Sequence, residues 1–243
     1  MLKILTLLLL LIAQVACTQT TKNKAIIQKD SIYQYQNPSR DGVGKIYMGR
    51  EISFVMDASG ATWLERYNRN EEENTTLAIN KLPITKNSVV ADIGAGSGYY
   101  TFRIAKKVPE GKVYAVEIQD EFVNILAQTK RTKAVKNVEI IKGNEQNPNL
   151  PANSIDLAIM VDVYHELAYP QEMLIALAKA LKPDGKILLL EYRAEDPTIA
   201  IKELHKMSVE QVSKEMEANG FKLYQREDFL PIQHFLVYEK ESK

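Results

Sequence analysis

The residues best placed to do chemistry form the stretch VVADIGAGSGYYT, from Val89 to Thr101. An apolar run ends there in Asp92, and glycines follow at every second position over Gly94–Gly98. A glycine-rich turn between a strand and a helix lets a ligand approach backbone N–H groups and the positive helix end. The spacing differs from the G-x-G-x-x-G of dinucleotide-binding turns, whose third glycine falls on Tyr99 here. Asp92 would repel a pyrophosphate, so the turn favours an amino-bearing ligand.

A second carboxylate follows at a distance that suits a ribose. Glu117 ends the next predicted strand, nineteen residues beyond Gly98. In nucleotide-binding α/β folds, a carboxylate at about this distance hydrogen-bonds the ribose 2′-hydroxyl. A tight strand-to-helix turn without any ligand is the alternative interpretation of the glycines.

A third group of residues follows the fourth predicted strand, where the stretch DVYHEL carries Asp162, His165 and Glu166. The ligand crevice of an open α/β sheet lies beyond the carboxyl ends of its strands. His205, after the fifth strand, and His234, at the start of the last strand, are expected at the same edge. Imidazole exchanges a proton near neutral pH. We therefore predict that this group is catalytic, with His165 as the general base and Asp162 or Glu166 orienting it.

Two other interpretations of the histidines stay open. One is that they are surface residues or ordinary hydrogen-bonded imidazoles. The other is a metal site, because histidines beside carboxylates are typical ligands. No two histidines stand one helical turn apart, however, so we assign no metal ligands from the sequence.

The elements that must position these residues alternate between valine- and isoleucine-rich runs and helical patterns, which is typical of parallel strands with crossover helices. Helices are expected from Asp120, from Pro170 and from Ser208, with Asp120 and Ser208 as N-caps. The last two strands are separated only by DFLPIQ and must pair antiparallel. We predict a doubly wound, seven-stranded, mostly parallel α/β sheet with a reversed last strand. Its strands are Val89–Ile93, Lys112–Glu117, Val138–Lys142, Ile155–Val161, Lys186–Tyr192, 221–227 and 234–240.

Together, DIGAGSG, YAVEIQ and the closing hairpin resemble the class I S-adenosylmethionine-dependent methyltransferases, over about Trp63 to Lys240. The resemblance implies a Rossmann-like methyltransferase fold with S-adenosylmethionine as cofactor. The cofactor-binding residues that it implies are Asp92 near the methionine amino group, Gly94, Ala95, Gly96 and Gly98 beneath the cofactor, Glu117 on the ribose, Ile118 against the adenine, Asn144 or Glu145 on the adenine amino group, and Asp162 near the methyl group.

The N-terminal residues have a pattern that is typical of a targeting segment. Residues 1–16 place Lys3 before an apolar stretch too short to cross a bilayer comfortably, which is a signal-peptide pattern. Ala16 precedes Cys17, the one cysteine, and this resembles a bacterial lipoprotein signal; a plain secretory signal is the alternative. We expect 17–60 to be a lipidated cysteine, tether and lead-in segment. Residues 61–243 are then the methyltransferase domain, with N-terminal capping helices.

The expected capping helices carry Trp63, Arg66 and Arg69 in the stretch TWLERYNRNEEE. An arginine there can pair with the cofactor carboxylate as a planar two-pronged donor. Alternatively, both arginines pair with the neighbouring glutamates.

Composition limits the partners, because 31 lysines and arginines balance 31 aspartates and glutamates. No net field attracts nucleic acid, so we expect a small-molecule acceptor and a membrane contacted through lipidated Cys17. The expected location is that of a membrane-anchored lipoprotein of a bacterial envelope, with the cytoplasm as the alternative. The predicted activity is S-adenosylmethionine-dependent methyl transfer to an undetermined acceptor. A cofactor-binding module without transfer and a nicotinamide-dependent oxidoreductase are the alternatives.

Overall fold

The computed structural model describes residues 32–241. The predicted signal peptide, Cys17 and the first part of the predicted tether lie outside the described residues. Within 32–241, no helix is both long and apolar enough to cross a membrane.

The main sheet has the strand order β10-β11-β8-β7-β4-β5-β6, with the short β9 paired to the end of β8. All pairs from β8 to β6 are parallel, and β11 runs antiparallel to β8 and to β10. This confirms the predicted seven-stranded doubly wound sheet with a reversed last strand. The strands are β4 (Val89–Ile93), β5 (Lys112–Glu117), β6 (Val138–Lys142), β7 (Ile155–Val161), β8 (Leu181–Arg193), β9 (Lys206–Met207), β10 (Phe221–Glu227) and β11 (Gln233–Lys240).

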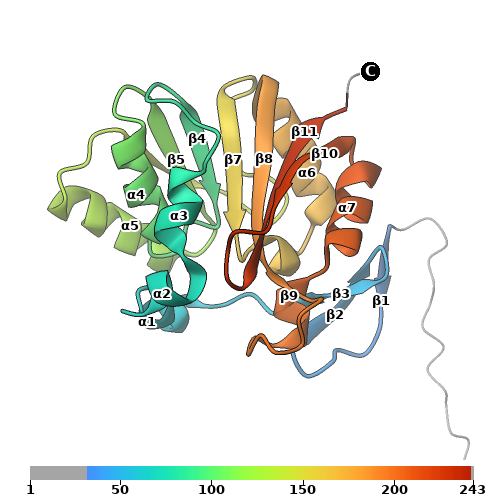
Figure 1. Cartoon of the computed structure of the whole chain (residues 1–243). Helices are drawn as coiled ribbons and strands as arrows, with labels where there is room; N and C mark the ends of the chain where they lie inside the picture. Colours follow the sequence, from blue (N-terminus) through green and yellow to red (C-terminus); the bar gives the residue numbers. More distant parts are fainter. Residues whose placement is uncertain (1–31, 242–243) are drawn as a thin grey trace, which may run out of the picture.

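Helices cover both faces of this sheet (Figure 1). One face packs against α3 (Thr75–Asn80), α4 (Tyr99–Lys107) and α5 (Asp120–Thr132). The other packs against α6 (Pro170–Ala180) and α7 (Val209–Ala218). Adjacent residues of β11 divide between the two cores, with Phe235 in one and Leu236 in the other. A strand buried on both sides is expected to be apolar throughout, which explains the valine- and isoleucine-rich runs.

A small antiparallel sheet lies at the end of the main sheet where its parallel strands finish, together with β9 and the first helices (Figure 1). It consists of β1 (Tyr33–Tyr35), β2 (Gly42–Tyr47) and β3 (Arg50–Ser53). The sequence predicts a tether and lead-in segment within 17–60, whereas the structure forms these three strands between residues 33 and 53. Buried Tyr33, Tyr47 and Ile52 pack there against Tyr169 of the main domain. Strands of three to six residues are too short to show a clear alternating pattern.

Between the two sheets the chain forms several short helical segments rather than one long helix. They are η1 (Ala58–Gly60), α1 (Ala61–Leu64), α2 (Arg69–Glu73) and α3. Two further single turns, η2 (Tyr164–Glu166) and η3 (Glu203–His205), follow β7 and β8. All of these segments except α3 contribute residues to the pocket described below.

Two predicted helix caps have different outcomes. Ser208 caps α7 by accepting a hydrogen bond from the Gln211 N–H at 3.1 Å. The Gln211 side-chain amide donates to Glu215, and among the described residues its oxygen does not accept the Ser208 N–H, so the reciprocal half of a capping box is absent. The predicted cap Asp120 is the first helical residue of α5, and Gln119 is the N-cap. At that position Asp120 still favours the helix through its dipole.

Candidate active site

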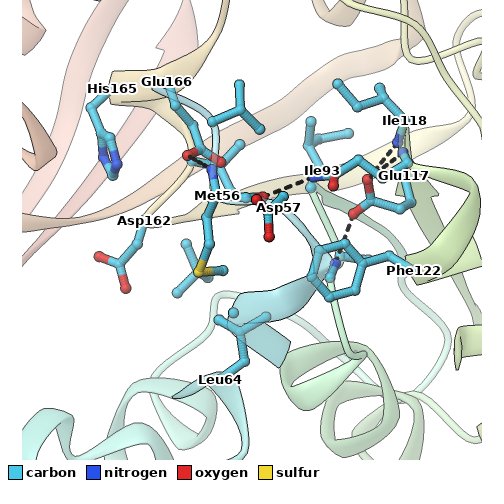
Figure 2. A pocket seen from close by; sticks show the side chains of 18 of the residues that line it. Met56, Asp57, Leu64, Ile93, Glu117, Ile118, Phe122, Asp162, His165 and Glu166 are labelled. Atoms are coloured by element: carbon cyan, nitrogen blue, oxygen red, sulfur yellow. Dashed lines mark hydrogen bonds between the residues drawn. The ribbon is translucent and has the colours of Figure 1, made fainter. Parts of the chain in front are cut away.

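A pocket of about 530 Å³ lies beyond the carboxyl ends of β4, β5 and β7. This volume is typical of small-molecule sites. Figure 2 shows two groups of side chains in it, with Glu117, Ile118 and Phe122 on one side and Asp162, His165 and Glu166 on the other. Met56 lies between them. The first group belongs to the predicted cofactor site and the second to the predicted catalytic group, so the structure places both in one cavity.

The floor of the pocket is the turn between β4 and α4. Gly94, Gly96 and Gly98 have φ angles of +70°, +53° and +87°, in the left-handed region that favours glycine. A Cβ at Gly94 would lie 2.7 Å from Val163, and one at Gly98 would contact Phe102. Side chains are therefore excluded on both conformational and steric grounds. The turn presents bare backbone to the pocket, which Ala95 also lines.

Glu117 is held at the pocket wall by three backbone donors. Its Oε2 accepts from the Gly96 N–H at 2.9 Å. Its Oε1 accepts from Ile118 at 2.6 Å and from Gln119 at 2.9 Å. The residue is buried and lines the pocket. A carboxylate fixed in this way suits two neighbouring ribose hydroxyls, as the sequence predicts.

Asp92 lies at the end of β4, is buried, and lines the pocket. Its carboxylate accepts a hydrogen bond from Thr101 Oγ1 at 2.5 Å. Burial raises the pKa of Asp92 to about 7, although the Thr101 hydrogen bonds oppose the shift. A cationic ligand such as an ammonium group would favour the ionised carboxylate. Asp92 therefore fits the methionine amino group.

The predicted adenine region is apolar on one side. Ile93, Ile118 and Phe122 line it. Asn144 and Glu145 also line the pocket and are exposed. Asn144 Oδ1 already accepts the N–H groups of Gln146 and Asn147, each at 2.9 Å, so the Glu145 carboxylate is the better acceptor for an adenine amino group.

Asp162 lies directly after β7 with a φ of +53°, an uncommon conformation for a residue with a side chain. Both carboxylate oxygens accept from the Gln233 amide, at 2.9 and 2.8 Å. Burial, together with the charges of Glu73 and Glu191, raises the pKa of Asp162 well above its ordinary value. Asp162 contributes to the pocket wall, but the structure pairs it with Gln233 and not with His165.

The two candidate arginines pair with the glutamates of their own segment. Arg66 contacts Glu72 at 2.7 Å and Glu73 at 2.5 Å. Arg69 contacts Glu73 at 2.8 Å and is almost fully buried. Arg69 and Trp63 nevertheless line the pocket. The glutamate pairing expected as the alternative is therefore present, and Arg69 still borders the cofactor side.

His165 is buried and hydrogen-bonded through Nδ1 to Glu191 Oε2 at 2.6 Å. The other Glu191 oxygen accepts the Tyr164 N–H at 2.8 Å. Burial works to lower the pKa of His165, but the Glu191 charge and hydrogen bond raise it above the ordinary value. Glu191 thus orients His165, the role predicted for Asp162 or Glu166. The sequence signal for it is a lone carboxylate at the end of the apolar run LLLEYR.

The loop after β8 folds over the pocket, as expected, and brings His205 to His165. The two ring centroids are 5.1 Å apart, and both residues line the cavity. Burial, followed by the nearby His165, lowers the pKa of His205 to about 4. Glu166 completes the group: its Oε2 accepts the Met56 N–H at 3.0 Å, and burial raises its pKa to about 7.

The structure does not bring His234 to this group. The residue is buried, and its Nε2 contacts Glu195 at 2.9 Å. It is absent from the pocket wall formed by the described residues. β11 lies outside β8 in the sheet, two strands further from β4 than β7 is. The expectation that all three histidines share the reactive edge is therefore corrected to two.

The fold and this pocket define a class I methyltransferase that uses S-adenosylmethionine. Residues 84–235 match the family model described as a methyltransferase domain, and the chain belongs to that family. A fibrillarin-like rRNA/tRNA 2′-O-methyltransferase of Methanosarcina barkeri is 27% identical over 193 residues, which cover 77% of this chain and 82% of the relative. An uncharacterized methyltransferase of Bacillus subtilis, YcgJ, is 28% identical over 130 residues, covering 53% and 51%.

Solved structures lead to the same assignment. A SAM-dependent methyltransferase from Aquifex aeolicus superposes with a TM-score of 0.71 and 25% identity, covering 76% of this chain and 98% of that one. The protein is thus an S-adenosylmethionine-dependent methyltransferase. When bound, the cofactor supplies a methyl group on a sulfonium ion. The bare glycine turn, Asp92 and Glu117 fit its backbone, amino and ribose portions.

Proposed function

We propose that the protein methylates a small molecule, and that this acceptor binds at the end of the pocket formed by His165, Glu166 and His205. The observation that carries the proposal is the continuity of one cavity from the glycine turn to these three residues. An in-line displacement needs the acceptor atom and the methyl group aligned in a space that excludes water. In this proposal the two ends of the pocket would hold the methyl group and the acceptor in that arrangement.

Proton removal is the second part of the proposal. An oxygen or nitrogen acceptor loses a proton as it gains the methyl group. Nδ1 of His165 is occupied by Glu191, so Nε2 is the ring atom available to accept that proton. The Glu191 carboxylate stabilises the resulting imidazolium.

The mouth of the pocket supports an acceptor with an apolar body. Phe54, Val55 and Trp63 line the cavity and are 50%, 42% and 39% exposed. Apolar side chains grouped in this way mark ligand-binding surfaces. The rRNA/tRNA specificity named for the Methanosarcina relative is not favoured, because this chain has equal numbers of basic and acidic residues.

We also propose that Cys17 is lipidated and anchors the domain to a bacterial membrane. The support is the apolar N-terminal stretch and the position of the one cysteine directly after Ala16. A location in the cytoplasm is the competing proposal, because S-adenosylmethionine is made there.

The decisive experiment incubates the purified protein with methyl-labelled S-adenosylmethionine and a cell extract, and then separates the products by size. Label is expected in organic-soluble small molecules. Gly96→Val, which blocks the cofactor site, is the control and should transfer no label. Label found only in RNA or in protein would overturn the small-molecule proposal.

A further inference from the structure

Three ligand-type side chains meet at the acceptor end of the pocket, and methyl transfer alone does not require all of them. His165, Glu166 and His205 each offer one nitrogen or carboxylate oxygen, and these atoms lie within 4.8 Å of one another. We propose that this cluster, the His-Glu-His cluster, binds a divalent transition-metal ion, with zinc the best-suited ion. The metal site is inferred from these side chains alone. The function of the ion in methyl transfer rests on the proposed function, in which the acceptor binds at this end of the pocket.

The donor set itself points to zinc. Two imidazoles and one carboxylate are a typical protein ligand set for zinc with a fourth position open to water or substrate. Ligand atoms of tetrahedral zinc are separated by about 3.4 Å, given metal–ligand distances near 2.0–2.1 Å. The side chains of the cluster would therefore close on an ion by movements of less than about 1 Å each.

His165 is prepared for metal binding by Glu191. Metal-ligating histidines commonly donate their second ring N–H to a carboxylate, which fixes the tautomer and raises the basicity of the ligating nitrogen. The His165 Nδ1–Glu191 Oε2 distance of 2.6 Å is such a contact. Because Nδ1 is occupied, the lone pair remains on Nε2.

His205 and Glu166 retain unused binding capacity. Nδ1 of His205 is buried and has no hydrogen-bond partner among the described residues, which is uncommon and calls for a ligand. Glu166 is fixed through one oxygen by the Met56 N–H at 3.0 Å. Lys202, which also lines the pocket, pairs with Asp41 at 3.0 Å and not with Glu166. A bound cation would supply a partner for the His205 ring and would balance the buried Glu166 carboxylate.

A metal ion at this position changes how the acceptor is activated. An ion held by these residues would lie at the proposed acceptor end of the pocket, and an acceptor oxygen that bound it would lose its proton more easily. In the metal-loaded protein Nε2 of His165 would be a ligand and could not take up the acceptor proton, which would instead be released to solvent as the acceptor binds the ion. In the metal-free protein Nε2 remains the base.

The test uses the full chain without an affinity tag, in a Cys17→Ser background that removes its one thiol. The protein is treated with a chelator, dialysed and titrated with Zn²⁺ by calorimetry and with Co²⁺ by absorption spectroscopy. We expect one ion per chain and a Co²⁺ spectrum typical of tetrahedral coordination. His205→Gln and Glu166→Gln should each weaken binding by at least about 100-fold, and Glu191→Gln by about 10- to 100-fold.

The matched control is His234→Gln, which removes a buried histidine outside the cluster. It should keep full metal affinity, and circular dichroism should show that every variant is folded. Equal affinities in the His205, Glu166 and His234 variants, or no saturable binding in the parent, would overturn the metal site. A parent protein that binds the metal ion but transfers no methyl group to small molecules would instead count against the proposed acceptor site. The two failures are therefore distinguishable.

Discussion

Glu191 Oε2 lies 2.6 Å from Nδ1 of His165, and both side chains are buried in the described structure. This contact fixes which ring nitrogen of His165 faces the pocket. Glu191→Gln would keep the shape of the side chain but remove its charge, so His165 would lose its oriented tautomer. We expect kcat/KM to fall about 10- to 100-fold, measured once an acceptor is known.

The chain supplies a matched control for that variant. Glu195 contacts His234 at 2.9 Å, a second histidine–carboxylate pair that lies outside the pocket wall. Glu195→Gln should leave kcat/KM within about twofold of the parent, because Glu195 is exposed and does not line the pocket, and surface substitutions usually also leave stability nearly unchanged. Equal losses in both variants would show that the Glu191 effect is structural.

The Glu117 carboxylate should dominate recognition of the cofactor ribose. Glu117→Ala removes an acceptor to which two ribose hydroxyls can donate. We expect affinity for both S-adenosylmethionine and its demethylated product to fall by about 1.5–3 kcal/mol, measured by calorimetry. Glu121→Ala, an exposed residue of α5, is the control and should bind normally. Unchanged affinity in a folded Glu117 variant contradicts the assignment.

The glycine turn makes a steric prediction. A Cβ at Gly96 would lie 2.9 Å from Leu64, in a backbone conformation with φ +53°. Gly96→Val should therefore both strain the turn and push a side chain toward the cofactor, weakening cofactor binding by at least about tenfold. Gly220→Ala separates the two effects, because Gly220 has φ +78° but open space around it. That variant should lose stability in thermal denaturation while keeping its cofactor affinity.

Cofactor binding should strengthen with pH through Asp92. Its pKa of about 7 in the folded protein means that much of the carboxyl is protonated at neutral pH. An ammonium group binds the ionised form better, so affinity should rise up to about pH 7 and level off above it. In the free protein the same raised pKa stabilises the fold at low pH, and this contribution is lost as pH rises through 7.

The control for the pH profile is Asp92→Asn. Its affinity for the cofactor should be lower and should no longer change with pH between about 5 and 8. Calorimetry in two buffers of different ionisation enthalpy would also detect the expected proton release below pH 7. A parent affinity that does not change with pH would contradict the Asp92 assignment.

Membrane attachment should depend on Cys17. A single acyl chain gives only marginal binding, and stable anchoring needs a second lipid signal. A lipoprotein-type modification should therefore place the wild type firmly in the membrane fraction. Cys17→Ser should move the protein to the soluble fraction or leave an unprocessed precursor. A wild-type protein that is soluble and keeps its N-terminus would contradict the proposal.

The sequence predicts the central sheet well for a physical reason. β4, β5, β6 and β7 match the predicted strands residue for residue. β4, β5 and β7 are buried almost throughout and are therefore nearly continuous apolar runs. β8 begins earlier than predicted, at Leu181, since its first residues lie in a segment whose proline and glycine suggest a turn.

The contact between His165 and His205 is difficult to predict from the sequence, because the fold brings the two residues together from distant positions in the chain. His165 and His205 are forty residues apart in the sequence, from 165 to 205, and come from turns after two different strands. Spacing rules for metal ligands detect residues on one helix or one loop. The role of Glu191 in orienting His165 is also not visible in the sequence, because their contact depends on how β8 lies beside the turn after β7.

The segment before the main sheet connects the two ends of the pocket. Met56 donates its N–H to Glu166 and accepts the Gln119 amide at 2.9 Å, so one residue touches both ends of the pocket. Yet Met56, Phe54 and Trp63 all precede residue 84, where the match to the family begins. The part of the chain that matches the family model carries the glycine turn, Asp92 and Glu117, whereas Phe54, Met56 and Trp63 line the pocket from the segment before it. If the acceptor binds where we propose, substitutions at these three side chains should change acceptor preference and leave the glycine turn intact.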